Sequence, residues 1–145
     1  MIDSNGRFWR GENFDDLVEY LREFQPGGYP VEHVNELTCP ECAGGTFYVE
    51  ADDTEGAALA RCAACQTIQY IADSVDYADE ADLVECACPC ANETFAIAVG
   101  YALRHDQEIR WISVGLRCIQ DGILGVYADW KIDYSPSRHL LTTAV

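Results

Sequence analysis

The spacing of hydrophobic positions near the start of the chain is that of a helix. Between Asn13 and Phe24, apolar side chains recur every three or four residues, at Phe14, Leu17, Val18, Leu21 and Phe24. This spacing places them on one helical face. Asn13 can cap the first turn, and Pro26-Gly27-Gly28 stops the helix. The pattern predicts an amphipathic helix whose apolar stripe packs on the rest of the protein.

Later in the chain the period changes to two, which is typical of strands. From Phe95 to Leu103 large residues alternate with the small residues Ala96, Ala98, Gly100 and Ala102. Such a strand would let a neighbouring element approach its small face closely. After a turn at His105-Asp106-Gln107, further strands are expected over 109–116 and 126–134. In the last one, Val126, Ala128, Trp130, Ile132 and Tyr134 are expected to share one face.

The two halves of the chain contain an internal repeat. The segment from Cys42 to Phe47 matches that from Cys90 to Phe95 at an offset of 48, and Arg61-Cys62 matches Arg117-Cys118 at an offset of 56. A fixed offset over several residues indicates a duplicated module. The change of offset places eight extra residues in the second copy, between Phe95 and Arg117.

The first copy contains a regular set of four cysteines. These are Cys39 and Cys42 in Cys-Pro-Glu-Cys, and Cys62 and Cys65 in Cys-Ala-Ala-Cys. Two such pairs are typical of a tetrahedral zinc site. On these residues the chain resembles the zinc-ribbon superfamily. The resemblance implies two turns, joined by antiparallel strands, that each give two thiolates to one metal; it implies no particular activity.

The second copy has a deformed set, with Ala87 opposite Cys39 and Asp121 where the repeat predicts a cysteine. Two ligand sets follow. We favour Cys86, Cys88, Cys90 and Cys118, because a thiolate gained in one turn would replace the one lost in the other. In the alternative, Asp121 joins Cys90, Cys118 and one of Cys86 and Cys88; a lost site is a third possibility. We expect two structural Zn²⁺ ions, with iron as an alternative at the same thiolates.

Composition indicates a globular chain that lies in a reducing compartment. Of 145 residues, 49% are hydrophobic and 23% charged. No apolar run approaches the roughly 18 residues of a membrane span, and the first residues lack the apolar stretch of a secretion signal. We therefore expect a cytoplasmic protein without membrane contact, in which paired cysteines bind metal rather than form disulfides.

Charge narrows the classes of partner. The formal net charge is −16, from 25 acidic and nine basic residues. Such a field repels phosphates, which argues against nucleic acid, and attracts a basic protein. The segment from Asp73 to Glu85 carries six acids and no base, and we interpret it as a solvated connector.

No catalytic constellation accompanies the metal sites. His33, His105 and His139 fall in expected loop, turn and tail positions. We therefore expect a non-enzymatic, acidic protein-interaction module, such as an inhibitor or immunity-type protein for a basic partner. One alternative is a metal-dependent enzyme or metal-handling protein that uses the irregular second site. The other is a zinc-ribbon accessory factor for nucleic acid or transcription.

Together these features predict a small β-rich metalloprotein of the α+β class, with an N-terminal helix and two tandem zinc ribbons of antiparallel strands. The expected divisions are 1–36 for the helical segment, 37–84 for the first ribbon and its acidic connector, and 85–145 for the second ribbon and the C-terminal tail.

Overall fold

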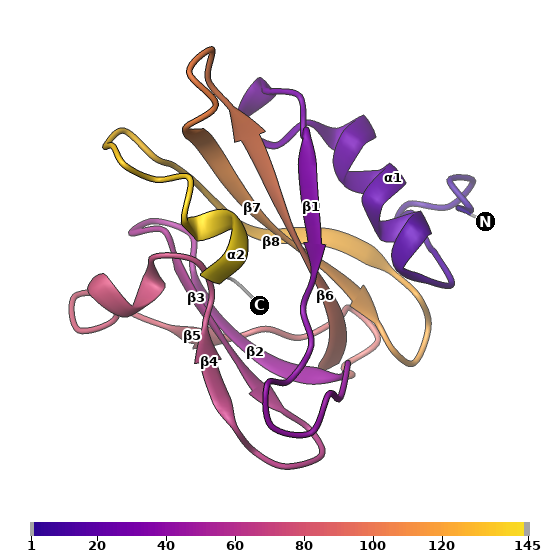
Figure 1. Cartoon of the computed structure of the whole chain (residues 1–145). Helices are drawn as coiled ribbons and strands as arrows, with labels where there is room; N and C mark the ends of the chain where they lie inside the picture. The colour runs from indigo at the N-terminus through magenta and orange to yellow at the C-terminus, as the bar shows by residue number, and fades with distance from the viewer. Residues whose placement is uncertain (1, 144–145) are drawn as a thin grey trace.

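The computed structural model describes residues 2–143, which form one antiparallel sheet with a helix on its outer side (Figure 1). The main helix is α1 (Phe14–Phe24), and a short helix α2 (Leu140–Thr143) lies near the C-terminus. The strands are β1 (His33–Glu36), β2 (Phe47–Asp52), β3 (Ala57–Cys62), β4 (Ile68–Tyr70), β5 (Val84–Glu85), β6 (Thr94–Leu103), β7 (Ile109–Cys118) and β8 (Leu124–Lys131). None of the described helices is long and apolar enough to cross a membrane.

The sheet is continuous through both copies of the repeat. Its order is β4-β3-β2-β6-β7-β8, with β1 paired to β6 and β5 paired to β2. The copies meet where Phe47 on β2 lies opposite Phe95 on β6. The structure is thus a small α+β fold dominated by one antiparallel sheet.

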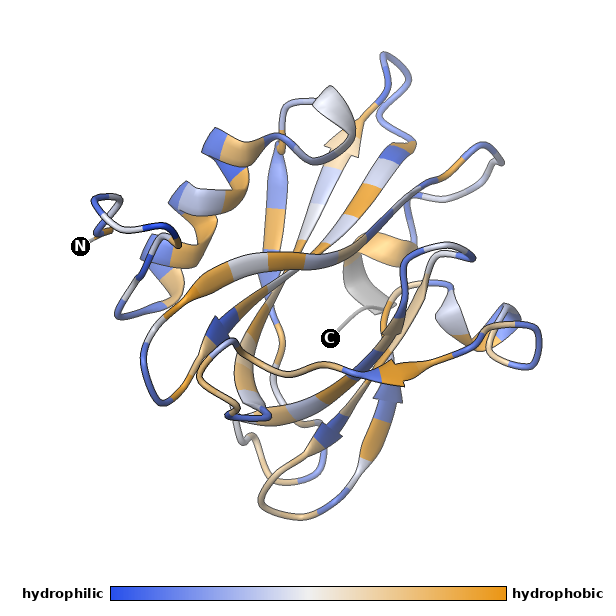
Figure 2. Ribbon diagram, turned by 180° about the vertical axis from the view of Figure 1, so that it is seen from behind, coloured by the Kyte–Doolittle hydropathy of each residue, from blue (hydrophilic) through white to orange (hydrophobic). Residues whose placement is uncertain are grey.

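One face of each strand forms the main core. Figure 2 shows hydrophobic and hydrophilic residues alternating along several strands, as the period of two requires. The core residues include Phe47 and Val49 on β2, Phe95 on β6 and Leu116 on β7, all at most 2% exposed. The alternation along β6 is therefore confirmed as a division between core and outer face.

The helix α1 packs on the outer face of β6, β7 and β8. Leu17 and Leu21 are buried there with Ala98 and Leu124. A Cβ atom added at Gly115 would lie 3.0 Å from Leu21 Cδ2, so a larger residue would push the helix away. The predicted helix and its Asn13 cap, whose side chain accepts from the Asp16 N–H, are confirmed, and so is the packing of its apolar stripe on the rest of the protein. The structure adds that α1 is the element that approaches the small residues of β6.

The predicted alternation along β8 is wrong at Val126. An irregularity between β7 and β8 pairs Val114 with Ala128 but Gly115 with Val126, so one residue of β8 is skipped. A bulge of this kind switches the faces of the residues before it. As a result Val126 packs with α1, whereas Tyr127 packs against the main core, its ring 5.4 Å from that of Phe95.

The acidic segment between the copies is not fully solvated. Asp73 is 4% exposed. Its carboxylate accepts hydrogen bonds from Trp130 Nε1 at 3.2 Å and from the Tyr134 hydroxyl at 2.6 Å. Burial, then this carboxylate, raises the pKa of Tyr134. The interpretation of this segment as a solvated connector is therefore wrong for Asp73. Its buried carboxylate is stabilised by hydrogen bonds from Trp130 and Tyr134 of the second copy.

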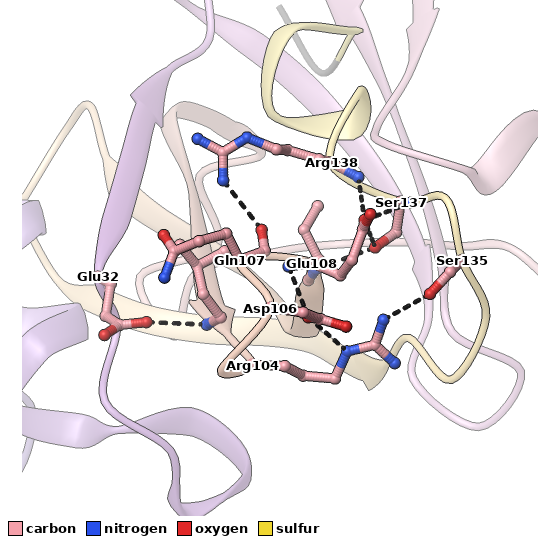
Figure 3. Close-up of polar contacts among 10 residues, drawn as sticks. Glu32, Arg104, Asp106, Gln107, Glu108, Ser135, Ser137 and Arg138 are labelled. Atoms are coloured by element: carbon pink, nitrogen blue, oxygen red, sulfur yellow. Dashed lines mark hydrogen bonds and ion pairs between the residues drawn. The ribbon is translucent and has the colours of Figure 1, made fainter.

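The turn between β6 and β7 is tied to the chain after β8 by the polar contacts in Figure 3. Glu108 Oε2 accepts hydrogen bonds from the Ser137 N–H, the Ser137 hydroxyl and the Arg138 N–H. Arg104 donates to the Ser135 hydroxyl at 2.6 Å. These contacts hold the C-terminal segment against the long hairpin of the second copy.

Candidate metal centres

The first four cysteines converge at one end of the β2–β3 hairpin. Cys39 and Cys42 precede β2, Cys62 ends β3, and Cys65 follows it. Their sulfurs all lie within 4.8 Å of one another. The Cys39–Cys65 and Cys42–Cys62 distances are 3.4 and 3.5 Å, much longer than the roughly 2.05 Å of a disulfide. Zinc bound at about 2.3 Å to four sulfurs would set them about 3.8 Å apart, so the cluster fits a tetrahedral ion after a small expansion.

Backbone hydrogen bonds shape the two turns that carry these sulfurs. In the first turn the Cys39 N–H donates to the Gly44 carbonyl and the Ala43 N–H donates to the Cys39 carbonyl, both at 2.8 Å. In the second turn the Cys62 N–H donates to the Thr67 carbonyl and the Gln66 N–H donates to the Cys62 carbonyl, both at 2.9 Å. Each turn thus aims two sulfurs towards the same point, one buried and one exposed.

The metal-free cluster does not hold four thiolates at neutral pH. Hydrogen bonds from the Thr67 hydroxyl and N–H lower the pKa of Cys65 to about 6. At Cys42 a hydrogen bond from the Gly44 N–H lowers the pKa, but the thiols of Cys62 and Cys65 outweigh it and raise the value to about 12. Since thiolates are the ligands, metal binding here must release protons.

The second cluster contains Cys88, Cys90, Cys118 and Asp121, whose ligand atoms also lie within 4.8 Å of one another. The Cys90 and Cys118 sulfurs are 3.7 Å apart, and the Cys88 sulfur is 3.5 Å from Asp121 Oδ1. Zinc with about 2.3 Å to sulfur and about 2.0 Å to a carboxylate oxygen produces separations of about 3.5–3.8 Å. Three thiolates and one carboxylate therefore fit a closed tetrahedral site.

The second turn of this cluster matches that of the first. The Cys118 N–H donates to the Ile123 carbonyl at 3.0 Å and the Gly122 N–H to the Cys118 carbonyl at 2.9 Å. This is the pattern around Cys62, moved by 56 residues. Asp121 therefore occupies the place of Cys65. The strand pairs Phe47–Cys62 and Phe95–Cys118 correspond in the same way.

The first turn of the second cluster is one residue shorter. The Ala91 N–H donates to the Cys88 carbonyl at 2.8 Å, and the Cys88 N–H donates to the Asn92 carbonyl at 2.8 Å. Only Pro89 separates Cys88 from Cys90, where two residues separate Cys39 from Cys42. Cys88 is thus the structural counterpart of Cys39, and the shift around Ala87 reflects this deletion.

The structure places Cys86 outside the cluster. Its N–H donates to the Val49 carbonyl at 2.9 Å, because the chain there runs along β2. Its side chain packs against the main core, and burial, then the charge of Glu50, raises the pKa of its thiol to about 11. The set that we favoured from the sequence, with Cys86 as a ligand, is therefore not the one that the structure brings together. The structure brings together the alternative set, in which Asp121 joins Cys88, Cys90 and Cys118.

Polar neighbours orient the ligands of the second cluster. Asn92 Nδ2 donates to the Cys118 sulfur at 3.2 Å, and the Ile123 N–H donates to Asp121 Oδ1 at 3.1 Å. Burial acts to raise the pKa of Asp121, but the hydrogen bonds from Ile123 and from the surrounding thiols outweigh it, and the net pKa is lowered. The carboxylate is thus ionised at neutral pH and available as a ligand.

The three histidines lie away from both clusters. His33, His105 and His139 are exposed at the surface, and the clusters consist of cysteines and one aspartate. His33 Nε2 lies 2.9 Å from Asn35 Oδ1. Asn92 is a donor to a ligand sulfur that was not expected from the sequence. The available signal was its position two residues after Cys90, where the first copy has Gly44.

Comparisons with protein-family models, with curated proteins and with solved structures find no match to this chain. The cluster of Cys39, Cys42, Cys62 and Cys65 is compatible with a zinc ribbon, and both clusters have ligand atoms close enough together to hold a metal ion.

Proposed function

We propose that this protein is an acidic, zinc-binding protein-interaction module, with two tandem zinc ribbons as its frame and a basic protein as its partner. The duplicated hairpins, each with a four-ligand cluster at one end, support the frame. The zinc ions would act as cross-links that contribute to folding. With four protein ligands around each ion, such sites are of the closed, structural type.

The observation that supports a basic partner is the excess of acidic residues in one segment of the chain. Residues 50–85, which run from β2 to β5, contain ten acids and one base, Arg61. Burial raises the pKa of Tyr77 there, and the charges of Asp73, Asp76, Asp133 and Glu80 raise it further. A field of this sign attracts a basic protein and speeds its association.

The proposal is tested by capturing partners with the zinc-loaded, tagged chain from an extract of its own host. The captured proteins are identified by mass spectrometry, purified, and titrated with the chain at about 50 and 300 mM salt. We expect a basic partner whose affinity falls several-fold as salt rises. Partners with salt-independent affinity would contradict the proposal, and so would a gel shift of DNA or RNA at moderate salt.

The substitution at Asp121 favours a second candidate, a metal-handling role for the second cluster. A carboxylate is a harder, weaker zinc ligand than a thiolate, so this ion should exchange faster than the first. The test is zinc transfer from the loaded chain to a metal-free acceptor protein. Transfer of one ion without loss of the first would support the role, and equal retention of both ions would contradict it.

A further inference from the structure

The internal repeat produces two equivalent outer faces, only one of which α1 covers. On the second copy, α1 packs against Ala98, Gly115, Leu124 and Val126. The repeat offsets and the strand registers equate these residues with Glu50, Leu59, Ile68 and Tyr70 on the first copy. Figure 1 shows α1 at the β6–β8 end of the molecule, away from β4.

We define the outer face of the first copy by Tyr48, Glu50, Leu59, Arg61, Ile68 and Tyr70. On β2 and β3 these residues alternate with core residues, and on β4 Ile68 and Tyr70 flank Gln69. Ile68 is 54% exposed and Tyr70 38% exposed, whereas Leu124, the counterpart of Ile68, is 3% exposed. The positions of Leu124 and Val126 thus carry apolar side chains in the first copy as well. There, within residues 2–143, Ile68 and Tyr70 stay exposed, whereas Leu59 is only 8% exposed. Contiguous exposed apolar surface is typical of interaction sites, and Ile68 and Tyr70 supply the exposed apolar part of this face.

Acidic residues lie on this outer face and beside it. Glu50 lies directly opposite Glu85 on β5, and like charges in this position destabilise a sheet. Glu93 lies beside them and lines the same small hollow as Tyr48, Arg61 and Cys86. Arg61, the base of this face, stacks on the Tyr48 ring at 4.8 Å. A ligand with positive charges would relieve the repulsion between Glu50 and Glu85.

We propose that this outer face binds a basic amphipathic helix of a partner protein, in the way that α1 lies on the second copy. The apolar side of that helix covers Ile68 and Tyr70, and its lysines or arginines pair with Glu50 and Glu85. Because Leu59 stands where the second copy has Gly115, the bound helix lies farther from the sheet than α1 does. This inference rests on the proposed function and adds the location and the form of the partner.

The test uses the full zinc-loaded chain and a designed probe. The probe is a fluorescent helical peptide with a leucine stripe flanked by lysines, and its counterpart has glutamates in place of the lysines. Binding is followed by fluorescence anisotropy, and the contact surface is mapped by NMR shifts of backbone amides. The double variants are Ile68→Ser/Tyr70→Ser and Glu50→Gln/Glu85→Gln. Phe24→Ser is the matched control, since Phe24 is 56% exposed on α1. Each variant must still bind two zinc ions.

We expect the lysine peptide to bind and to shift amides of β3 and β4. The Ile68→Ser/Tyr70→Ser variant should lose about tenfold in affinity and the Glu50→Gln/Glu85→Gln variant several-fold, with little change in Phe24→Ser. Salt-sensitive binding that the outer-face variants leave unchanged would overturn this inference while leaving the acidic module intact. Equal binding of the glutamate peptide would overturn the proposed function itself. Absence of binding, or dimerisation of the chain through Ile68 and Tyr70, would overturn the basic helix as the occupant.

Discussion

Among single residues, two changes distinguish the second cluster from the first. Asp121 takes the place of Cys65, and one residue is missing between Cys88 and Cys90. Asp121 stands in a turn whose backbone hydrogen bonds match those around Cys65. This turn therefore accepts either residue, and the change from thiolate to carboxylate should weaken the hold on the second ion.

The first prediction concerns Asp121→Cys. A fourth thiolate should slow zinc release from the second centre to a chromophoric chelator, since thiolates hold zinc more firmly than a carboxylate does. Asp121→Ala should speed that release. The rate for the first centre should stay the same in both variants. Identical release rates in all three proteins would exclude Asp121 as a ligand.

A second prediction compares Cys42→Ser with Cys86→Ser. Native mass spectrometry should find one zinc ion in the first variant and two in the second, because Cys86 packs against the core outside both clusters. In the zinc-loaded chain Cys86 should also be alkylated before any ligand cysteine, though slowly, because burial raises the pKa of its thiol. Loss of one zinc ion in the Cys86→Ser variant would instead support Cys86, Cys88, Cys90 and Cys118 as the ligands of the second centre.

At the scale of elements, the contact between α1 and the sheet depends on glycine in the strands. Gly100 and Gly115 lie under Leu21, and a Cβ at either would come within 3.4 Å of its side chain. Leu21 is 0% exposed as a result. The helix is therefore anchored by a few closely packed residues.

A third prediction follows for Leu21→Ala. Loss of this side chain should lower the free energy of unfolding by about 2–5 kcal/mol, the usual cost of a buried cavity. Phe24→Ala, on the same helix but 56% exposed, should cost less than about 1 kcal/mol. Urea denaturation of the zinc-loaded proteins measures both values. Equal effects would mean that α1 is not held through Leu21.

The hydrogen bonds of Glu108 in the β6–β7 turn lead to a prediction on how stability depends on pH. Hydrogen bonds from the Ser137 N–H and hydroxyl, and from the Arg138 N–H, lower the pKa of Glu108 below its usual 4.5. Because this pKa is lower in the folded chain than in the unfolded chain, the ionised carboxylate stabilises the fold at any pH above the pKa of the unfolded chain. This contribution is lost as the pH falls through the pKa of the folded chain. Glu108→Gln should therefore unfold at a lower temperature than the native chain at pH 7. Thermal scans should show a constant difference from pH 7 to about pH 5 and a shrinking one as the pH falls through 4.5 and below. A difference that stays constant below pH 4.5 would contradict the assignment.

In the whole molecule, the two cysteine clusters lie on one continuous sheet. The pair Phe47–Phe95 joins the two hairpins, and the buried carboxylate of Asp73 joins the acidic segment to β8. Loss of either ion should therefore affect more than its own hairpin.

The last prediction concerns metal removal. Structural zinc can contribute about 10 kcal/mol or more to folding, which is comparable to the whole stability of a domain of this size. A strong chelator at neutral pH should abolish the cooperative thermal transition seen by far-UV circular dichroism, and added zinc should restore it. An unchanged midpoint without metal would show that the clusters do not stabilise the fold.

The helix from Phe14 to Phe24, the long alternating strands, the repeat and the first cluster could all be predicted from the amino-acid sequence. Each depends on short-range spacing: a period of 3.6 or 2, or two residues between paired cysteines. Tertiary structure decided which residue completes the second cluster, because the register of β5 on β2 draws Cys86 away. It also decided which face Val126 takes, that Asp73 is buried, and that α1 covers only one of two equivalent faces. These depend on contacts between residues far apart in the chain, which local spacing does not encode.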